Sequence, residues 1–82
     1  MEDNRVALLA IIVESPDSVE GINKVLHEYR EAVIGRMGIP YKERQISIIS
    51  VAVDANANTI SAMAGKIGKL DGVSVKTVYS KV

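Results

Sequence analysis

The chain has no cysteine, no tryptophan and no phenylalanine, and His27 is the single histidine among its 82 residues. Without cysteine, neither a disulfide nor a zinc–thiolate site can form. A transition-metal site within one subunit needs three or four ligands, commonly histidine or cysteine. His27, with Glu28 and Glu31 beside it, is therefore read as a solvated helix residue. We expect no metal and no other cofactor in a single subunit; only a site shared between subunits could still use His27.

The chain also lacks net charge and long apolar runs. Ten basic and ten acidic residues cancel, so no long-range field attracts nucleic acid or an anionic membrane. The longest apolar run, Val6–Val13, has eight residues, whereas a membrane-spanning helix needs about 20. The first four residues are acidic and polar, unlike the basic start of a secretion signal. These features predict a cytoplasmic protein that binds no membrane and, by this chain alone, no nucleic acid.

What the chain does have is apolar content, at 48% of its residues. Its length predicts one domain spanning residues 1–82. A domain of this size buries only about 60–65% of the surface that its unfolded chain exposes, so its core alone is marginal. Small domains usually compensate with disulfides, metals or partners. Because cysteine is absent, a partner chain is the remaining candidate.

Hydrophobic periodicity and turn residues divide the chain into six elements. We expect strands near 5–13, 32–37, 45–54 and 72–80, and helices near 16–31 and 57–70. Ser15 is the expected N-cap of the first helix, and Asn56 or Asn58 that of the second. Gly72 is placed to end the second helix in the left-handed conformation.

The order of these elements is strand, helix, strand, strand, helix, strand. Right-handed crossovers place the third strand between the first and the second. The sequence therefore predicts an α+β fold, a ferredoxin-like βαββαβ sandwich. Its four-stranded antiparallel sheet has the order 4-1-3-2, with both helices on one face.

In each central strand, both the odd-numbered and the even-numbered residues are apolar, so both faces of the strand are apolar; we call these two sets of residues the two parities. An antiparallel sheet with one solvated face normally alternates apolar and polar residues instead. Two helices cover only one face, so large aliphatic side chains would remain on the other. Burial of four of them is worth about 6–12 kcal/mol as an upper bound, and such patches usually mark an interface. We expect a homo-oligomer, dimer or tetramer. Which parity faces the helices is open, so the interface candidates are Leu8, Leu9, Ile48 and Ile49.

Catalytic constellations are not apparent in the sequence. No serine or threonine is accompanied by a positioned base. Glu14 and Asp54 follow two antiparallel strands, so they are expected at opposite ends of the sheet rather than as an acid–base pair. The strand at 45–53 has neither the aromatic nor the basic residues on which ferredoxin-like domains stack RNA bases. We therefore predict that the chain is not an enzyme.

The segment Gly35–Tyr41 has an unusual composition. Its two glycines allow close approach of a backbone to a partner or ligand, and Arg36 offers a planar fork for a carboxylate or phosphate. One interpretation is an effector pocket or subunit contact; the other is a hairpin turn with an ordinary surface arginine. The candidate residues are Gly35, Arg36, Met37, Gly38, Pro40 and Tyr41.

Three segments, Val33–Tyr41, Ile46–Asp54 and Gly65–Val73, resemble the family of iron-only hydrogenase system regulators. The run Leu70-Asp71-Gly72-Val73 is also similar to ACT domains, and the C-terminal domain of the nickel-responsive transcriptional regulator shares the architecture. The resemblance implies a ferredoxin-like, ACT-like regulatory domain that oligomerises. The nickel regulator binds its metal through histidines and a cysteine, and this chain has one histidine and no cysteine.

Taken together, these features favour a non-catalytic regulatory or sensing domain that binds a small effector or a partner protein as a homo-oligomer. The alternatives on the same fold are a trace-metal-binding protein and a small enzyme subunit. The missing metal ligands argue against the first alternative, and the missing base–nucleophile pair argues against the second.

Zero net charge and the absence of stacking residues generate a first prediction. The isolated chain should not shift a duplex or single-stranded oligonucleotide in a gel at sub-micromolar protein concentration. A shift that weakens steeply as salt rises, the signature of phosphate contacts, would contradict it.

Overall fold

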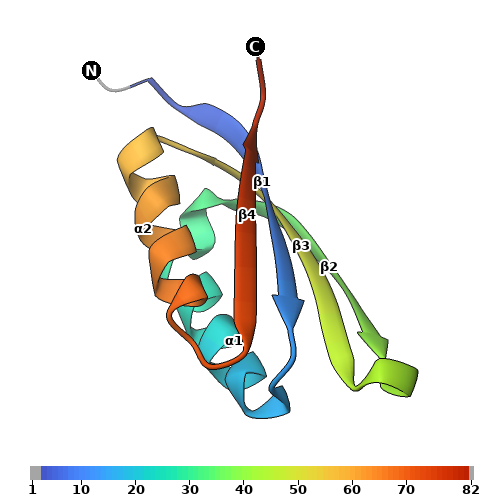
Figure 1. The fold of residues 1–82 in the computed structure, drawn as a ribbon. Coiled ribbons are helices and arrows are strands. Elements are labelled where there is room, and N and C mark those ends of the chain that lie inside the picture. Colours follow the sequence, from blue (N-terminus) through green and yellow to red (C-terminus); the bar gives the residue numbers. More distant parts are fainter. Residues whose placement is uncertain (1–2, 82) are drawn as a thin grey trace.

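The computed structural model describes residues 3–81, and it consists of one four-stranded sheet with a layer of helices against it (Figure 1). The strands are β1 (Arg5–Val13), β2 (Val33–Tyr41), β3 (Ile46–Ala55) and β4 (Val73–Tyr79). The two α-helices are α1 (Val19–Glu28) and α2 (Ala57–Gly68). Three short 3-10 turns, Pro16–Ser18, Arg30–Ala32 and Lys42–Arg44, complete the described elements. No helix in residues 3–81 is long and apolar enough to cross a bilayer.

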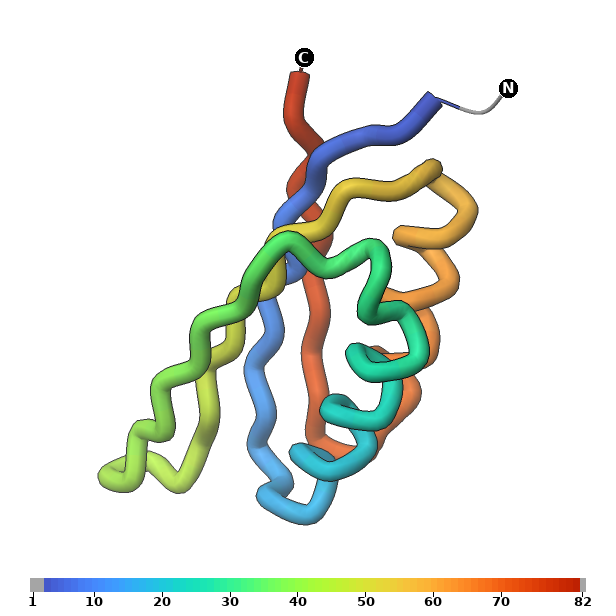
Figure 2. Tube along the Cα trace, turned by 180° about the vertical axis from the view of Figure 1, so that it is seen from behind, coloured from blue at the N-terminus to red at the C-terminus, as the bar shows by residue number. Residues whose placement is uncertain are grey.

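The sheet has the order β2-β3-β1-β4, and every neighbouring pair of strands is antiparallel. This confirms the predicted ferredoxin-like architecture and places β1 and β3 at the centre. Both helices lie on the same side of the sheet, and the hairpin of β2 and β3 projects past them (Figure 2). Glu14 and Asp54 lie at opposite ends of the sheet, as expected, because Asp54 pairs with Val6 at the start of β1.

Asn56 explains where the second helix begins, and Gly72 shapes the turn that follows the helix. Asn56 accepts a hydrogen bond from the Thr59 backbone N–H at 2.9 Å and is the N-cap of α2, as one of the two predicted alternatives. Gly72 has the predicted left-handed conformation, with φ = 67°. It does not end the helix, however, because α2 ends at Gly68 and Gly72 lies in the turn that follows. Its carbonyl accepts a 2.7 Å hydrogen bond from the Glu14 N–H, so the turn after α2 is tied to the end of β1.

The first helix is shorter than expected, and Ser15, although it precedes the first helical turn as predicted, does not cap it with its side chain. Ser15 makes no capping hydrogen bond, and the helical region 16–32 is divided into a 3-10 turn, α1 and a second 3-10 turn. The serine whose side chain forms a hydrogen bond at the start of this helix is Ser18, which is buried. Its hydroxyl donates to the Asp71 carbonyl at 2.6 Å. This bond ties the start of the first helix to the turn before β4.

The second strand is longer than predicted. It runs to Tyr41, so Gly38, Ile39 and Pro40 lie within the strand instead of ending it. Proline is tolerated because β2 is an edge strand, where a missing N–H costs no central ladder bond. A register shift between Val33 and Gly35 forms a bulge near the start of the strand. The hairpin turn is the 3-10 segment Lys42–Arg44, followed by Gln45 at φ = 55°.

The structure resolves the parity of the central strands. Leu9 is fully buried and Ile49 is 4% exposed, so the odd-numbered residues of β1 and their partners face the helices. Ile22 and Leu26 of α1 pack on them from one side, and α2 contributes Ile60, Met63 and Ile67. The strand residues buried in this core are Ala7, Leu9, Ile11, Val13, Ile49, Val51, Val53 and Ala55.

The conformation of Gly72 generates a second prediction, for Gly72→Ala. A Cβ at this position would lie 2.9 Å from the Ser15 Cβ and 3.0 Å from the Ser15 backbone nitrogen. The left-handed conformation alone costs about 1–2 kcal/mol for a residue other than glycine, so the free energy of unfolding in urea should fall by at least that amount. Gly65→Ala is the matched control, because nothing lies within 4 Å of its Cβ position in α2. It should raise stability by about 0.5–1 kcal/mol. Equal effects of the two substitutions would contradict the prediction.

Candidate functional site

The face of the sheet away from the helices is apolar and uncovered by any described segment, and we call it the free face. Residues that pair across strands share a face, so the register defines its members. Leu8 is 42% exposed and Ile48 is 39% exposed, and both lie on the two central strands. The free face consists of Val6, Leu8, Ala10 and Ile12 of β1, Gly35, Met37, Ile39 and Tyr41 of β2, Ile46, Ile48, Ser50, Ala52 and Asp54 of β3, and Ser74, Lys76 and Val78 of β4.

The four interface candidates from the sequence divide into two pairs. Leu8 and Ile48 belong to the free face, whereas Leu9 and Ile49 belong to the core. This division could not be made from the sequence, because both parities of each strand carry aliphatic side chains. The set that makes up the free face contains two charged residues, Lys76, which pairs with Ala10, and Asp54, which pairs with Val6.

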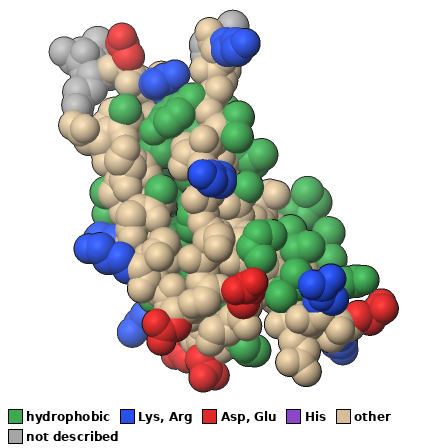
Figure 3. Space-filling view, in the orientation of Figure 1, with side chains coloured by type: hydrophobic (Ala, Val, Ile, Leu, Met, Phe, Trp, Pro, Cys, Tyr) green, Lys and Arg blue, Asp and Glu red, His purple; other side chains and the backbone are tan. Residues whose placement is uncertain are grey.

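The candidate segment 35–41 is likewise divided between two surfaces. Met37 and Tyr41 lie on the free face, whereas Arg36, Gly38 and Pro40 pair with residues on the helix side. In the space-filling view, hydrophobic side chains gather over the projecting hairpin at the right and over the upper ends of β1 and β4 (Figure 3). The segment therefore contributes to two surfaces, and neither is the hairpin turn that the sequence also allowed.

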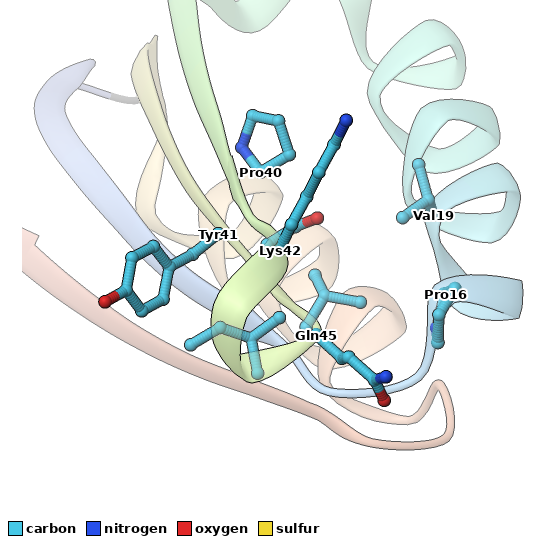
Figure 4. Close-up of a pocket in the computed structure, with 9 residues that line it drawn as sticks. Pro16, Val19, Pro40, Tyr41, Lys42 and Gln45 are labelled. Atoms are coloured by element: carbon cyan, nitrogen blue, oxygen red, sulfur yellow. The ribbon is translucent and has the colours of Figure 1, made fainter.

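A cleft of about 320 Å³ lies beneath the projecting hairpin on the helix side. Figure 4 shows Pro16 and Val19 on one wall and Pro40, Lys42 and Gln45 on the other, while the Tyr41 ring points away from the cleft. Val13, Ile46 and Ser47 complete its lining. The cleft exists because β2 and β3 extend past α1, which leaves the inner side of the hairpin uncovered.

A second hollow, of about 310 Å³, lies between α1 and the edge strand β2. The Arg36 Nη1 donates to the Asn23 Oδ1 at 3.0 Å across this gap. The Arg30 Nη1 donates to the His27 carbonyl, also at 3.0 Å. The contact between Arg36 and Asn23 could not be predicted from the spacing of these residues in the sequence, because it depends on how α1 packs against β2. The lining consists of Asn23, Leu26, His27, Arg30, Val33 and Arg36.

The helix layer carries the one ion pair among residues 3–81, between Lys66 of α2 and Glu28 of α1 at 2.9 Å. The hydrogen bond to Glu28 raises the pKa of Lys66, and Tyr29 contributes in the same direction. The ammonium also lies 5.0 Å from the centre of the Tyr29 ring. Lys66 is exposed, and it joins the two helices.

Residues 3–81 bring together no group of three histidine, cysteine or carboxylate side chains that could hold a metal ion. His27 is exposed and lies beside Arg30 instead of beside other ligands. The arrangement can bind through apolar contact on the free face and through arginine donors beside α1.

The fold and these surfaces define a small ferredoxin-like, ACT-like domain. Residues 5–77 match the TM1266-like family, whose description is "Iron-only hydrogenase system regulator, putative", and the chain belongs to this family. The match confirms the resemblance noted from segments 33–41, 46–54 and 65–73. No curated protein matches the chain at a significant level.

Solved structures support the family and the fold. The uncharacterized protein TM1266 from Thermotoga maritima is 34% identical, with a TM-score of 0.92 over 96% of this chain and 100% of its own. The C-terminal domain of MgtC from Mycobacterium tuberculosis has a TM-score of 0.74 at 9% identity, over 99% of this chain and 93% of its own. A homoserine dehydrogenase from Thiobacillus denitrificans has a TM-score of 0.67 at 18% identity, over 93% of this chain but 17% of the enzyme. The last two similarities show the fold alone.

Proposed function

We propose that this chain is a non-catalytic, cytoplasmic regulatory domain that works as a homo-oligomer, and that the free face is its self-association surface. The observation that carries the proposal is the free face itself. Six of its hydrophobic side chains are each more than 40% exposed: Val6, Leu8, Met37, Ile39, Tyr41 and Val78. A contiguous apolar surface of this kind is costly in water and usually marks an interface.

A second copy of the chain is the occupant that fits this surface best. A two-fold contact between identical faces is self-complementary, so it needs no separately matched partner. The free face carries two charges of opposite sign, and both lie at its margins. Asp54 lies near the end of β3, opposite Val6 at the start of β1, and Lys76 lies on the edge strand β4, so most of the contact between two copies would be apolar. The small size of the domain adds a reason, because the core of an 82-residue chain is marginal by itself.

The extent of the free face is sufficient for a specific contact. Four strands about 4.8 Å apart, each rising about 3.4 Å per residue, span a surface of roughly 500 Å². Two copies would together bury on the order of 1,000 Å², which is the lower limit expected of a biological interface. The hairpin that projects past the helices carries Ile39, Tyr41 and Ile48, and it extends the contact beyond the body of the domain.

The regulatory part of the proposal is supported by the family description as iron-only hydrogenase system regulators. In this role the domain would bind a small effector or a partner protein and transmit its presence through the oligomer. The hollow between α1 and β2 leaves room for an effector while the free face is occupied, because none of its lining residues belongs to the free face.

The test of self-association compares four substitutions by aspartate. Leu8→Asp and Ile48→Asp should convert the oligomer to a monomer that retains its circular dichroism spectrum. Burial of such a side chain is worth about 1.5–3 kcal/mol, and a two-fold contact contains it twice, so the dimer dissociation constant should rise at least about a hundredfold. Leu9→Asp should instead unfold the domain, because Leu9 is fully buried.

Ser61→Asp, on the exposed side of α2, is the control and should change neither fold nor assembly. Sedimentation velocity at micromolar concentration reports the state of each variant. A wild-type protein that sediments as a folded monomer would overturn the proposal, as would a Leu8→Asp variant that assembles like the wild type.

A further inference from the structure

The hollow between α1 and β2 is lined by Asn23, Leu26, His27, Arg30, Val33 and Arg36, and we call it the arginine pocket. Two guanidinium groups and one imidazole contribute to its lining, and no carboxylate does. Within residues 3–81, no carboxylate lies within 4.0 Å of Arg30 or Arg36. The one acidic residue of this helix end that forms an ion pair, Glu28, is engaged by Lys66 of α2. Two arginines without anionic partners therefore share one cavity in a chain whose net charge is zero.

Both arginines are held in place by hydrogen bonds at the pocket wall. Arg36 reaches across from β2 to the Asn23 Oδ1, and Arg30 folds back to the His27 carbonyl. Each of these hydrogen bonds uses one nitrogen of a guanidinium that carries five N–H donors. The remaining donors can bind a ligand without first releasing an ion pair. A planar fork of this kind matches the two oxygens of a carboxylate or phosphate.

The floor of the arginine pocket is apolar. Leu26 is buried and belongs to the core, and Val33 packs against that core from the start of β2. The volume of about 310 Å³ is at the lower end of the range for small-molecule sites. A ligand that uses both features has an oxyanion for the arginines and a compact apolar part for the floor.

We propose that the arginine pocket binds a small oxyanion, a carboxylate or phosphate carried on a compact apolar molecule, and that this is the effector site of the domain. The role of effector site rests on the proposed regulatory function, whereas the arginine pocket itself lies within one subunit and does not depend on self-association. Arg36 and Met37 are neighbours in β2 and lie on opposite faces of the sheet, so the pocket stays open when the free face is covered.

The test uses the full chain, labelled with ¹⁵N, and two separate probes: inorganic phosphate and isovalerate, a compact aliphatic carboxylate. At least one probe should cause saturable shifts of the Arg30 and Arg36 side-chain signals at concentrations up to about 10 mM, above the ~1 mM dissociation constants of weak binding. Saturation by one probe and not the other identifies the oxyanion.

Arg30→Gln and Arg36→Gln should each weaken that binding about tenfold or more, because each removes a charged donor. Arg44→Gln is the matched control, since Arg44 lies in the turn at the tip of the hairpin. No saturable shift with either probe would overturn the inference, as would equal weakening by Arg44→Gln. A duplex oligonucleotide that displaces the probe with steep salt dependence would also overturn it and would point to nucleic acid.

Two measurements separate a failure here from a failure of the proposed self-association. Arg36→Gln should leave the sedimentation of the protein unchanged, and the Leu8→Asp monomer should bind the probe as the wild type does. A monomeric wild type that binds the probe would refute the oligomer and keep the pocket. An oligomeric wild type that binds neither probe would refute the pocket and keep the proposed self-association.

Discussion

Two helices can cover only one face of a four-stranded sheet, and the other features of this molecule depend on that constraint. α1 and α2 bury the odd-numbered side chains of β1 and their partners on β3 in a core that includes Ile22, Ile60 and Met63. The even-numbered side chains of β1 are also aliphatic, yet no described segment packs on them. The same period of two that places Leu9 in the core places Leu8 in solvent. In this protein the sheet is both the wall of the core and an outer surface.

Most of the fold could be predicted from the sequence, because strand length, turn residues and right-handed crossovers all favour one topology. The parity of β1 could not, since Leu8 and Leu9 are equally apolar and only packing against α1 and α2 distinguishes them. The length of β2 was missed for a different reason. Gly38 and Pro40 disrupt a central strand but are tolerated in an edge strand, and edge position is a property of the whole sheet.

The candidate site was foreseen in part. The composition of segment 35–41 drew attention to Arg36, but its partner Asn23 was not identified, because thirteen residues and a chain reversal separate them. Arg30 and His27 are ordinary surface residues by sequence, and they become neighbours of Arg36 only when α1 lies beside β2. Alternation along β2 then places one residue at this pocket and the next on the free face. A small displacement of β2 would therefore alter both the arginine pocket and the free face.

The edge formed by β2 has a further consequence for solubility. Unpaired backbone groups along an edge strand are a template for adding strands from other molecules, the first step of fibre growth. Here a bulge between Val33 and Gly35 bends the edge near one end, and Pro40, which has no N–H to donate, interrupts it near the other. Only a short stretch between them can pair with a foreign strand. The β2 edge is thereby a poor template for open-ended addition of strands.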